Sequence, residues 1–169
     1  MPTTLPRAAL FLAGFWLALA LLVPMVARGE TAGAAFARSE DDLHALVNAV
    51  RADAGLVTLR RDGALDRVAR AHAADMAARR YLSHDTPEGL SPVDRLERGG
   101  VEGFTLAAEN AGQTDRAEPS REILEGWLRS PEHRRNLYFP PFNTTGLGIA
   151  RASDGTWYVV QLYVTVPRE

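Results

Sequence analysis

The chain of 169 residues contains no cysteine, and all 19 of its basic residues are arginine. Without cysteine there is no disulfide scaffold, no thiolate nucleophile and no cysteine metal site. Without lysine there is neither a Schiff-base lysine nor the lysine of a phosphate-binding loop. The lack of cysteine, taken alone, favours a reducing compartment or a protein that is indifferent to redox conditions.

The sequence also lacks a basic tract, and its formal net charge is -2. Both features argue against a dedicated nucleic-acid-binding protein. The length fits one ordinary domain. With 46% hydrophobic and 24% charged residues, the composition is that of a globular protein and not of a disordered chain.

Residues 8–27 form an apolar run without a charged residue, and Arg7 precedes it. A run of about 20 apolar residues is long enough to span a bilayer. A basic residue, an apolar stretch and then small residues is also the layout of a secretory signal peptide. We favour a cleaved signal peptide over a retained anchor or a buried core helix. Residues 1–37 are thus expected to hold a signal peptide or membrane anchor with a short linker, and residues 38–169 an exported domain that is secreted, periplasmic or in the cell envelope.

Start and stop signals predict two long helices at the beginning of this domain. Ser39 and Asp42 form a capping box that starts the first helix, and Gly55 ends it. Asp62 caps the second helix, which is expected to stop near Arg80.

Shorter elements follow. A short helix runs from Ser91-Pro92 to Gly99-Gly100, another opens at Pro119, and a helical turn starts at Ser130-Pro131. Extended segments are expected at three places, the last two joined by a hairpin turn. Because the helices come first and a hairpin comes last, the order of elements predicts an α+β domain with an antiparallel sheet. The extended segments are 104–111, 145–152 and 157–166.

The surroundings of the four histidines divide them into two pairs. His44 lies beside apolar helix positions and His72 on an apolar helix stripe, so we interpret both as structural. His84 lies in a loop, and loops carry functional residues disproportionately. His133 lies near the start of a short helix, whose positive end favours the neutral imidazole that a metal requires. Glu109 is a carboxylate in an otherwise apolar segment, where burial would require a partner or a metal.

His84, Glu109 and His133 are too far apart in sequence to match a local zinc signature. A Ser-His-Asp hydrolase stays open as an alternative, with Ser83 or Ser130 as the nucleophile. The sequence contains no G-x-S-x-G motif to support it.

Five segments in a fixed order are specific in combination, although none is specific alone. They are LVNAVRADAG (46–55), AHAADMAARRYLSHDTPEGLSPVDRLERGG (71–100), AEN (108–110), WLRSPEHRRNL (127–137) and TGLGIA (145–150). Together they resemble the CAP superfamily of cysteine-rich secretory proteins, antigen 5 and pathogenesis-related proteins, in its short bacterial SCP-domain branch. The resemblance covers essentially the whole chain after the apolar run. It implies an α-β-α sandwich with a three-stranded antiparallel sheet and a large open cleft.

In that family the cleft holds two histidines and two acidic residues, which in some members bind a divalent metal such as zinc. The resemblance assigns His84, His133 and Glu109 to three of these positions. The second acid has no counterpart after Trp127, and Ala108 replaces the usual glycine before Glu109. A metal on the three remaining residues would need water or a fourth ligand.

Three functions fit the expected cleft, whose lining would include Asn110 and Gln161. We favour an exported module that binds a small or lipidic ligand, or a divalent metal, without turnover. The second hypothesis is a metal-dependent, peptidase-like hydrolase in which Glu109 is the general base. The third is a non-catalytic cell-envelope interaction domain. Expected partners are a small molecule, a lipid or an envelope component, with no nucleic acid and with membrane contact only through residues 8–27.

Overall fold

The computed structural model of the protein describes residues 31–167. Its first helix, α1 (Ala32–Asp53), begins before the predicted capping box. Thr31 is the N-cap, whereas the Ser39 hydroxyl donates to the carbonyl of Ala35 within the helix. Phe36 packs edge-on against Trp157, a tertiary contact that stabilises the extra turns. The prediction of a start at Ser39 was therefore wrong.

The predicted end of α1 is confirmed, because Gly55 follows its C-cap with a φ of +70°, a conformation that favours glycine. Helix α1 crosses the boundary we placed between residues 37 and 38.

The apolar segment 8–27 lies outside the described residues, so the division of the chain stays a prediction. Within residues 31–167 no helix is long and apolar enough to cross a membrane.

The next two helices follow their sequence signals closely. Helix α2 (Gly63–Arg79) begins after Asp62, whose carboxylate accepts from the backbone N–H groups of the first turn. Helix α3 (Pro92–Arg98) begins at a reciprocal capping box between Ser91 and Asp94. These signals succeed because each depends only on residues within one helical turn.

The sheet has the strand order β1-β3-β4-β2. Strands β2 (Leu106–Thr114), β3 (Thr144–Arg151) and β4 (Trp157–Thr165) pair antiparallel, as predicted. The prediction of a three-stranded sheet missed β1 (Arg60–Arg61), which pairs parallel to the start of β3. Two residues are too few to show the alternation that marks a strand.

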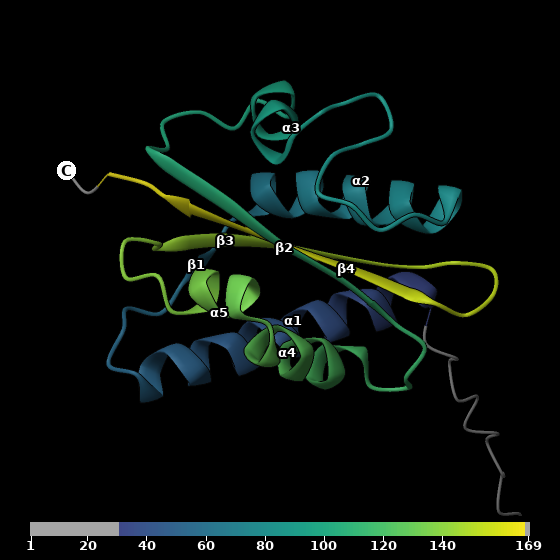
Figure 1. The fold of residues 1–169 in the computed structure, drawn as a ribbon, viewed down its shortest axis with the longest axis horizontal. Coiled ribbons are helices and arrows are strands. Elements are labelled where there is room, and N and C mark those ends of the chain that lie inside the picture. Colours follow the sequence, from purple (N-terminus) through teal and green to yellow (C-terminus); the bar gives the residue numbers. More distant parts are fainter. Residues whose placement is uncertain (1–30, 168–169) are drawn as a thin grey trace, which may run out of the picture.

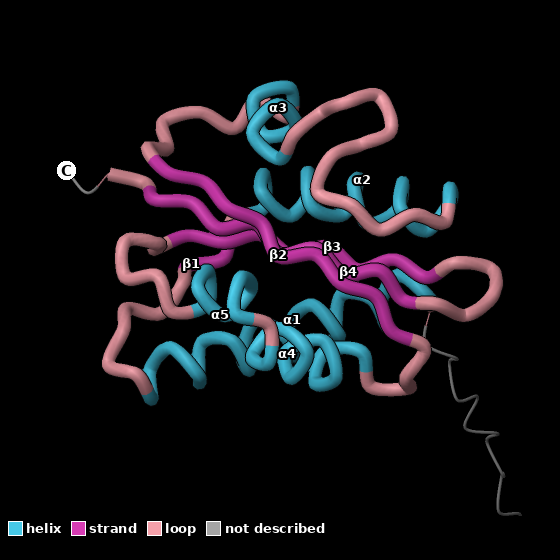
Figure 2. Tube along the Cα trace, in the orientation of Figure 1, coloured by secondary structure: helices cyan, strands magenta, loops and turns pink. Residues whose placement is uncertain are grey.

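Helices cover both faces of this sheet, which confirms the α-β-α sandwich (Figures 1 and 2). Helices α2 and α3 lie on one face. Helix α1, α4 (Pro119–Arg129) and α5 (Pro131–Leu137) lie on the other. Alternate residues of β4 point into the two resulting cores. Strand β2 forms one edge of the sheet, and both helical layers reach it.

Helix α2 packs unusually close to β3. A Cβ atom added at Gly146 would lie 2.3 Å from the carbonyl carbon of Leu65, and one at Gly148 would lie 2.2 Å from that of Ala69. The helix backbone occupies these positions, so only glycine fits. Beyond β1, the backbone N–H groups of Leu147 and Ile149 donate to the carboxylates of Asp66 and Glu40. Side chains therefore cover this sheet edge.

Candidate functional site

The predicted site residues meet at the edge strand β2. Glu109 and Asn110 are neighbours on this strand, so their side chains point to opposite faces of the sheet. Glu109 contacts residues of the α2–α3 layer, and Asn110 contacts residues of the α4–α5 layer. Side chains from both helical layers therefore approach each other at the edge of β2.

The carboxylate of Glu109 is engaged on both oxygens. His84 Nδ1 donates to Oε1 at 2.9 Å, and an Arg95 Nη atom donates to Oε2 at 2.6 Å. The Glu109 side chain is only 1% exposed, whereas that of His84 is 52% exposed. The charge of this buried carboxylate is therefore balanced inside the protein by Arg95, and its hydrogen bond fixes the orientation of the His84 ring.

Arg95 also holds the loop that carries His84. Its second Nη atom donates to the carbonyls of His84 and Leu90, at 2.6 and 2.9 Å. On the other side of the loop, His72 Nε2 donates to the carbonyl of Ser83 at 2.9 Å. One guanidinium thus positions the backbone and the side chain of the site histidine. Arg95 was not among the predicted site residues, because no local signal in the sequence pairs it with Glu109.

Asn110 positions the second histidine. Its side-chain amide donates to the backbone carbonyl of His133 at 3.1 Å, and its oxygen accepts from Asn136 at 2.9 Å. Asn136 also donates to the backbone carbonyl of Glu109 on the free edge of β2. Asn110 is 0% exposed, so it supports the site from within the protein and does not line an open cleft.

Gln161 is also fully buried, on β4 beneath the edge strand. It accepts from the hydroxyl of Tyr163 and donates to that of Thr145, at 2.8 and 3.1 Å. Tyr163 in turn contacts Asn110 at 3.2 Å. The expectation that Gln161 lines the cleft is therefore corrected: it belongs to a buried polar network that reaches the site through Tyr163 and Asn110.

His133 and His84 approach each other across the strand edge, with ring centroids 6.4 Å apart. Burial lowers the pKa of His133, and the neighbouring His84 lowers it further. The hydrogen bond to Glu109 raises the pKa of His84, although burial opposes this. The preference of His133 for the neutral form, which we expected from the helix end, thus follows from burial and from the neighbouring His84.

The predicted three-ligand metal set is not formed as expected. Within residues 31–167 no group of three histidine or carboxylate side chains is arranged to hold a metal ion. Glu109 is inaccessible and bound to Arg95, and His84 uses Nδ1 for Glu109. The residues therefore do not fit a site in which Glu109 is a ligand, which leaves at most the two imidazoles of His84 and His133.

The contacts of the remaining histidines and of the two candidate serines do not indicate a catalytic role. His72 is 1% exposed, and burial lowers its pKa. His44 lies 2.9 Å from the carbonyl of Leu59. The Ser83 hydroxyl accepts from the backbone N–H of Asp85. In the described part of the chain no hydrogen bond joins the hydroxyl of Ser83 or Ser130 to a histidine, so nothing there supports a serine nucleophile.

A groove of about 380 Å³ opens beside His133. Its apolar walls include Leu82, Ile123 and Trp127, and Leu82 is an exposed large hydrophobic residue. Gly126 lies in the wall formed by α4, with open space in front of its Cα. The groove thus combines an apolar wall with an imidazole whose pKa is lowered by burial.

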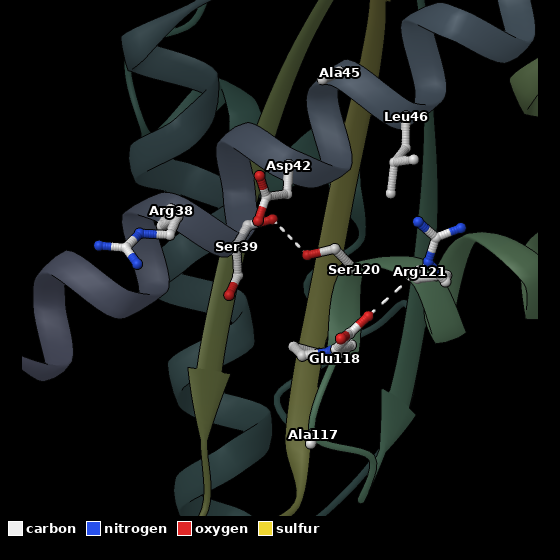
Figure 3. A pocket seen from close by; sticks show the side chains of 10 residues that line it. Arg38, Ser39, Asp42, Ala45, Leu46, Ala117, Glu118, Ser120 and Arg121 are labelled. Atoms are coloured by element: carbon white, nitrogen blue, oxygen red, sulfur yellow. Dashed lines mark hydrogen bonds and ion pairs between the residues drawn. The ribbon is translucent and has the colours of Figure 1, made fainter.

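A larger groove, of about 700 Å³, lies between α1 and the start of α4 (Figure 3). The Ser120 hydroxyl donates to the carbonyl of Ser39 across it, and Glu118 pairs with Arg121 at 3.9 Å. None of the histidines lines it. Size alone therefore does not identify the functional site, because this groove has no part of the network around Glu109.

The sequence profile of the cysteine-rich secretory protein (CAP) family matches residues 44–163. The chain belongs to this family. It is 31% identical over 109 residues to the uncharacterized protein YkwD of Bacillus subtilis, a match that spans 64% of the chain and 41% of that protein. The CAP domain described here therefore spans under half the length of that relative.

Two solved structures show the same fold. An extracellular SCP-domain protein from Bacillus anthracis is 32% identical, with a TM-score of 0.68, over 77% of this chain and 41% of that one. An outer surface protein from Borrelia burgdorferi is 21% identical, with a TM-score of 0.70, over 77% of this chain and 94% of that one. The CAP membership and the α+β fold predicted from the sequence are confirmed.

Proposed function

We propose that this chain is an exported CAP domain and that the groove beside His133 binds a small amphipathic or lipidic ligand without turnover. The proposal rests on one observation: an apolar wall that includes Leu82 and Trp127 lies beside the half-buried imidazole of His133. Binding sites for small molecules combine mostly apolar linings with a few polar groups that fix orientation. His133 in the groove wall, with the ring of His84 6.4 Å away between centroids, would supply those groups for an anionic or hydroxylated head.

Binding is favoured over hydrolysis by the state of Glu109. A general base must come within hydrogen-bond reach of the water whose proton it takes. The Glu109 side chain is 1% exposed and is bound by His84 and Arg95, so a water molecule would have to displace a buried ion pair. We therefore assign Glu109 the role of holding His84, and we expect no peptidase activity.

Filling the groove tests the proposal directly. Gly126→Leu places a side chain in open space on the groove wall. Gly63→Leu is the matched control, because Gly63 is also a helical glycine with open space before it and lies outside the groove. Titration with decanoate in a calorimeter is expected to give binding that Gly126→Leu abolishes and Gly63→Leu retains. Equal affinities in both variants would refute the groove as the binding site.

A divalent metal is the second candidate ligand. Its support is the proximity of His84 and His133, whose ring centroids lie 6.4 Å apart. Zinc titration by calorimetry tests it, with His84→Ala and His133→Ala as variants and His44→Ala as control. Heat that is lost only in the two site variants would support the metal. Absence of heat between pH 6 and 8 would leave the small ligand or a purely interacting envelope domain.

Export is the remaining part of the proposal. It rests on the apolar run at residues 8–27 and on the extracellular relative from Bacillus anthracis. N-terminal sequencing of the protein recovered from medium, periplasm and membranes would separate a cleaved signal peptide from a retained anchor. Recovery of the uncleaved chain from the cytosol alone would contradict export.

A further inference from the structure

A third groove, lined by arginines, lies between the end of α4 and α5. It encloses about 460 Å³ and contains none of the histidines. Three arginines line it together with apolar residues. The lining residues are Leu128, Arg129, Pro131, Arg134, Arg135 and Tyr138.

The positive charges of these arginines are hardly balanced by acidic side chains of the protein. Among residues 31–167, the guanidinium groups of Arg134 and Arg135 make no hydrogen bond or ion pair, whereas most other arginines there have an acceptor. Arg129 pairs with Glu125 only at 3.7 Å, and both side chains are more than half exposed. The nearest other acid along the chain, Glu132, pairs with none of the three in this part of the protein. The groove is therefore locally positive on a chain whose net charge is -2.

One guanidinium is already oriented. Arg134 lies over the ring of Tyr138, with its central carbon 5.5 Å from the ring centroid. A guanidinium stacked on an aromatic ring keeps its N–H edge free, and that edge matches the geometry of phosphate oxygens. Leu128 and Pro131 form an apolar surface beside it. Arginine and tyrosine next to apolar residues are typical of the interface between a membrane and water.

We propose that this groove docks on a membrane surface that carries anionic phospholipids, with headgroup phosphates between Arg134 and Arg135. Charge complementarity supports the phosphates, and the apolar lining residues Leu128 and Pro131 with Tyr138 favour a lipid surface over a soluble anion. Arg129 lines both this groove and the groove beside His133, whereas Arg134, Arg135 and Tyr138 line only this one. The proposed docking adds a membrane contact outside residues 8–27, where the only one was expected from the sequence.

The test compares binding of the full chain to vesicles of phosphatidylglycerol mixed with phosphatidylcholine and to vesicles of phosphatidylcholine alone. Since an arginine near an anionic surface contributes about 1 kcal/mol, Arg134→Gln with Arg135→Gln is expected to lower the preference for the anionic vesicles about 25-fold. Arg67→Gln with Arg116→Gln removes the same charge from exposed positions elsewhere and is expected to change it little. Equal losses in both double variants, or no preference in the unmodified chain, would overturn the proposal.

A second measurement covers the case in which the apolar segment 8–27 holds the chain on both vesicles. Nuclear magnetic resonance spectra in nanodiscs with spin-labelled lipid are expected to show broadening at Arg134, Arg135 and Tyr138 with phosphatidylglycerol and not with phosphatidylcholine alone. Soluble glycerol 3-phosphate is expected not to shift these signals. Unbroadened signals, or saturable binding of the soluble phosphate, would overturn the membrane as the partner.

Discussion

Arg95 and Glu109 form an ion pair at 2.6 Å between side chains that are 9% and 1% exposed. The same guanidinium binds the carbonyl of His84, and the same carboxylate binds the imidazole of His84. Removal of one partner from a buried pair leaves the other charge uncompensated. The position of His84, and with it the site, therefore depends on this pair.

The first prediction concerns the stability that this pair provides. Arg95→Ala leaves Glu109 buried without its cation, so we expect the free energy of unfolding to fall by about 3 kcal/mol. Arg98→Ala, at an exposed position of the same helix, is expected to change it by less than about 0.5 kcal/mol. Urea unfolding measures both. Similar losses in the two variants would show that the ion pair is not what stabilises the loop.

The second prediction concerns pH. The hydrogen bond to Glu109 raises the pKa of His84 above its ordinary value of 6.5, so its contribution to stability is full below pH 6.5 and is lost as the pH rises through the raised pKa. Burial lowers the pKa values of His72 and His133. Their contributions are full above pH 6.5 and are lost as the pH falls through the lowered pKa values.

Imidazole signals followed by nuclear magnetic resonance give these pKa values directly. We expect the order His84 above His133, and we expect Glu109→Gln to lower the pKa of His84. A pKa of His84 that lies below 6.5 in the unmodified chain would contradict the assigned cause.

The third prediction concerns the contact between α2 and β3. Gly148→Ala would bring a Cβ atom to 2.2 Å from the backbone of Ala69, so the helix must move away from the sheet. We expect a loss of about 3 kcal/mol or failure to fold. Gly63→Ala, in open space, is the control and is expected to be neutral or slightly stabilising. Thermal unfolding compares them, and equal melting temperatures would contradict the close approach.

The fourth prediction concerns Arg51, which is 0% exposed and has no carboxylate partner in the described part of the chain. Its guanidinium donates to backbone carbonyls of four residues: Val57, Leu137, Phe139 and Phe142. A lysine has a single ammonium group and cannot reach all four. We expect Arg51→Lys to cost about 3 kcal/mol in unfolding free energy, because buried carbonyls lose their donors. An unchanged urea midpoint would refute this role.

The sequence predicted best what depends on neighbours in the chain. The cap at Asp62 and the helix start at Ser91-Pro92 were located correctly, because their hydrogen bonds stay within one helical turn. Strand β1 was missed because it depends on its pairing with the start of β3. The start of α1 was missed although its N-cap, Thr31, accepts a hydrogen bond within the first turn.

The site was predicted in the same partial way. The resemblance indicated His84, Glu109 and His133, and the structure brings all three to the edge of β2. The remaining differences from the prediction follow from burial. Glu109 is buried in an ion pair with Arg95, and Gln161 is buried beneath the surface. Neither fact has a signal in the local sequence, because both follow from the pairing of distant segments.

The most direct test of the account is a decanoate titration of the chain, followed residue by residue by nuclear magnetic resonance. We expect the imidazole signals of His84 and His133 and the indole signal of Trp127 to shift together in one saturable step, and this step to be absent in Gly126→Leu. Shifts confined to Ser39 and Ser120, in the groove between α1 and α4, would contradict the proposal that the histidine groove is the binding site.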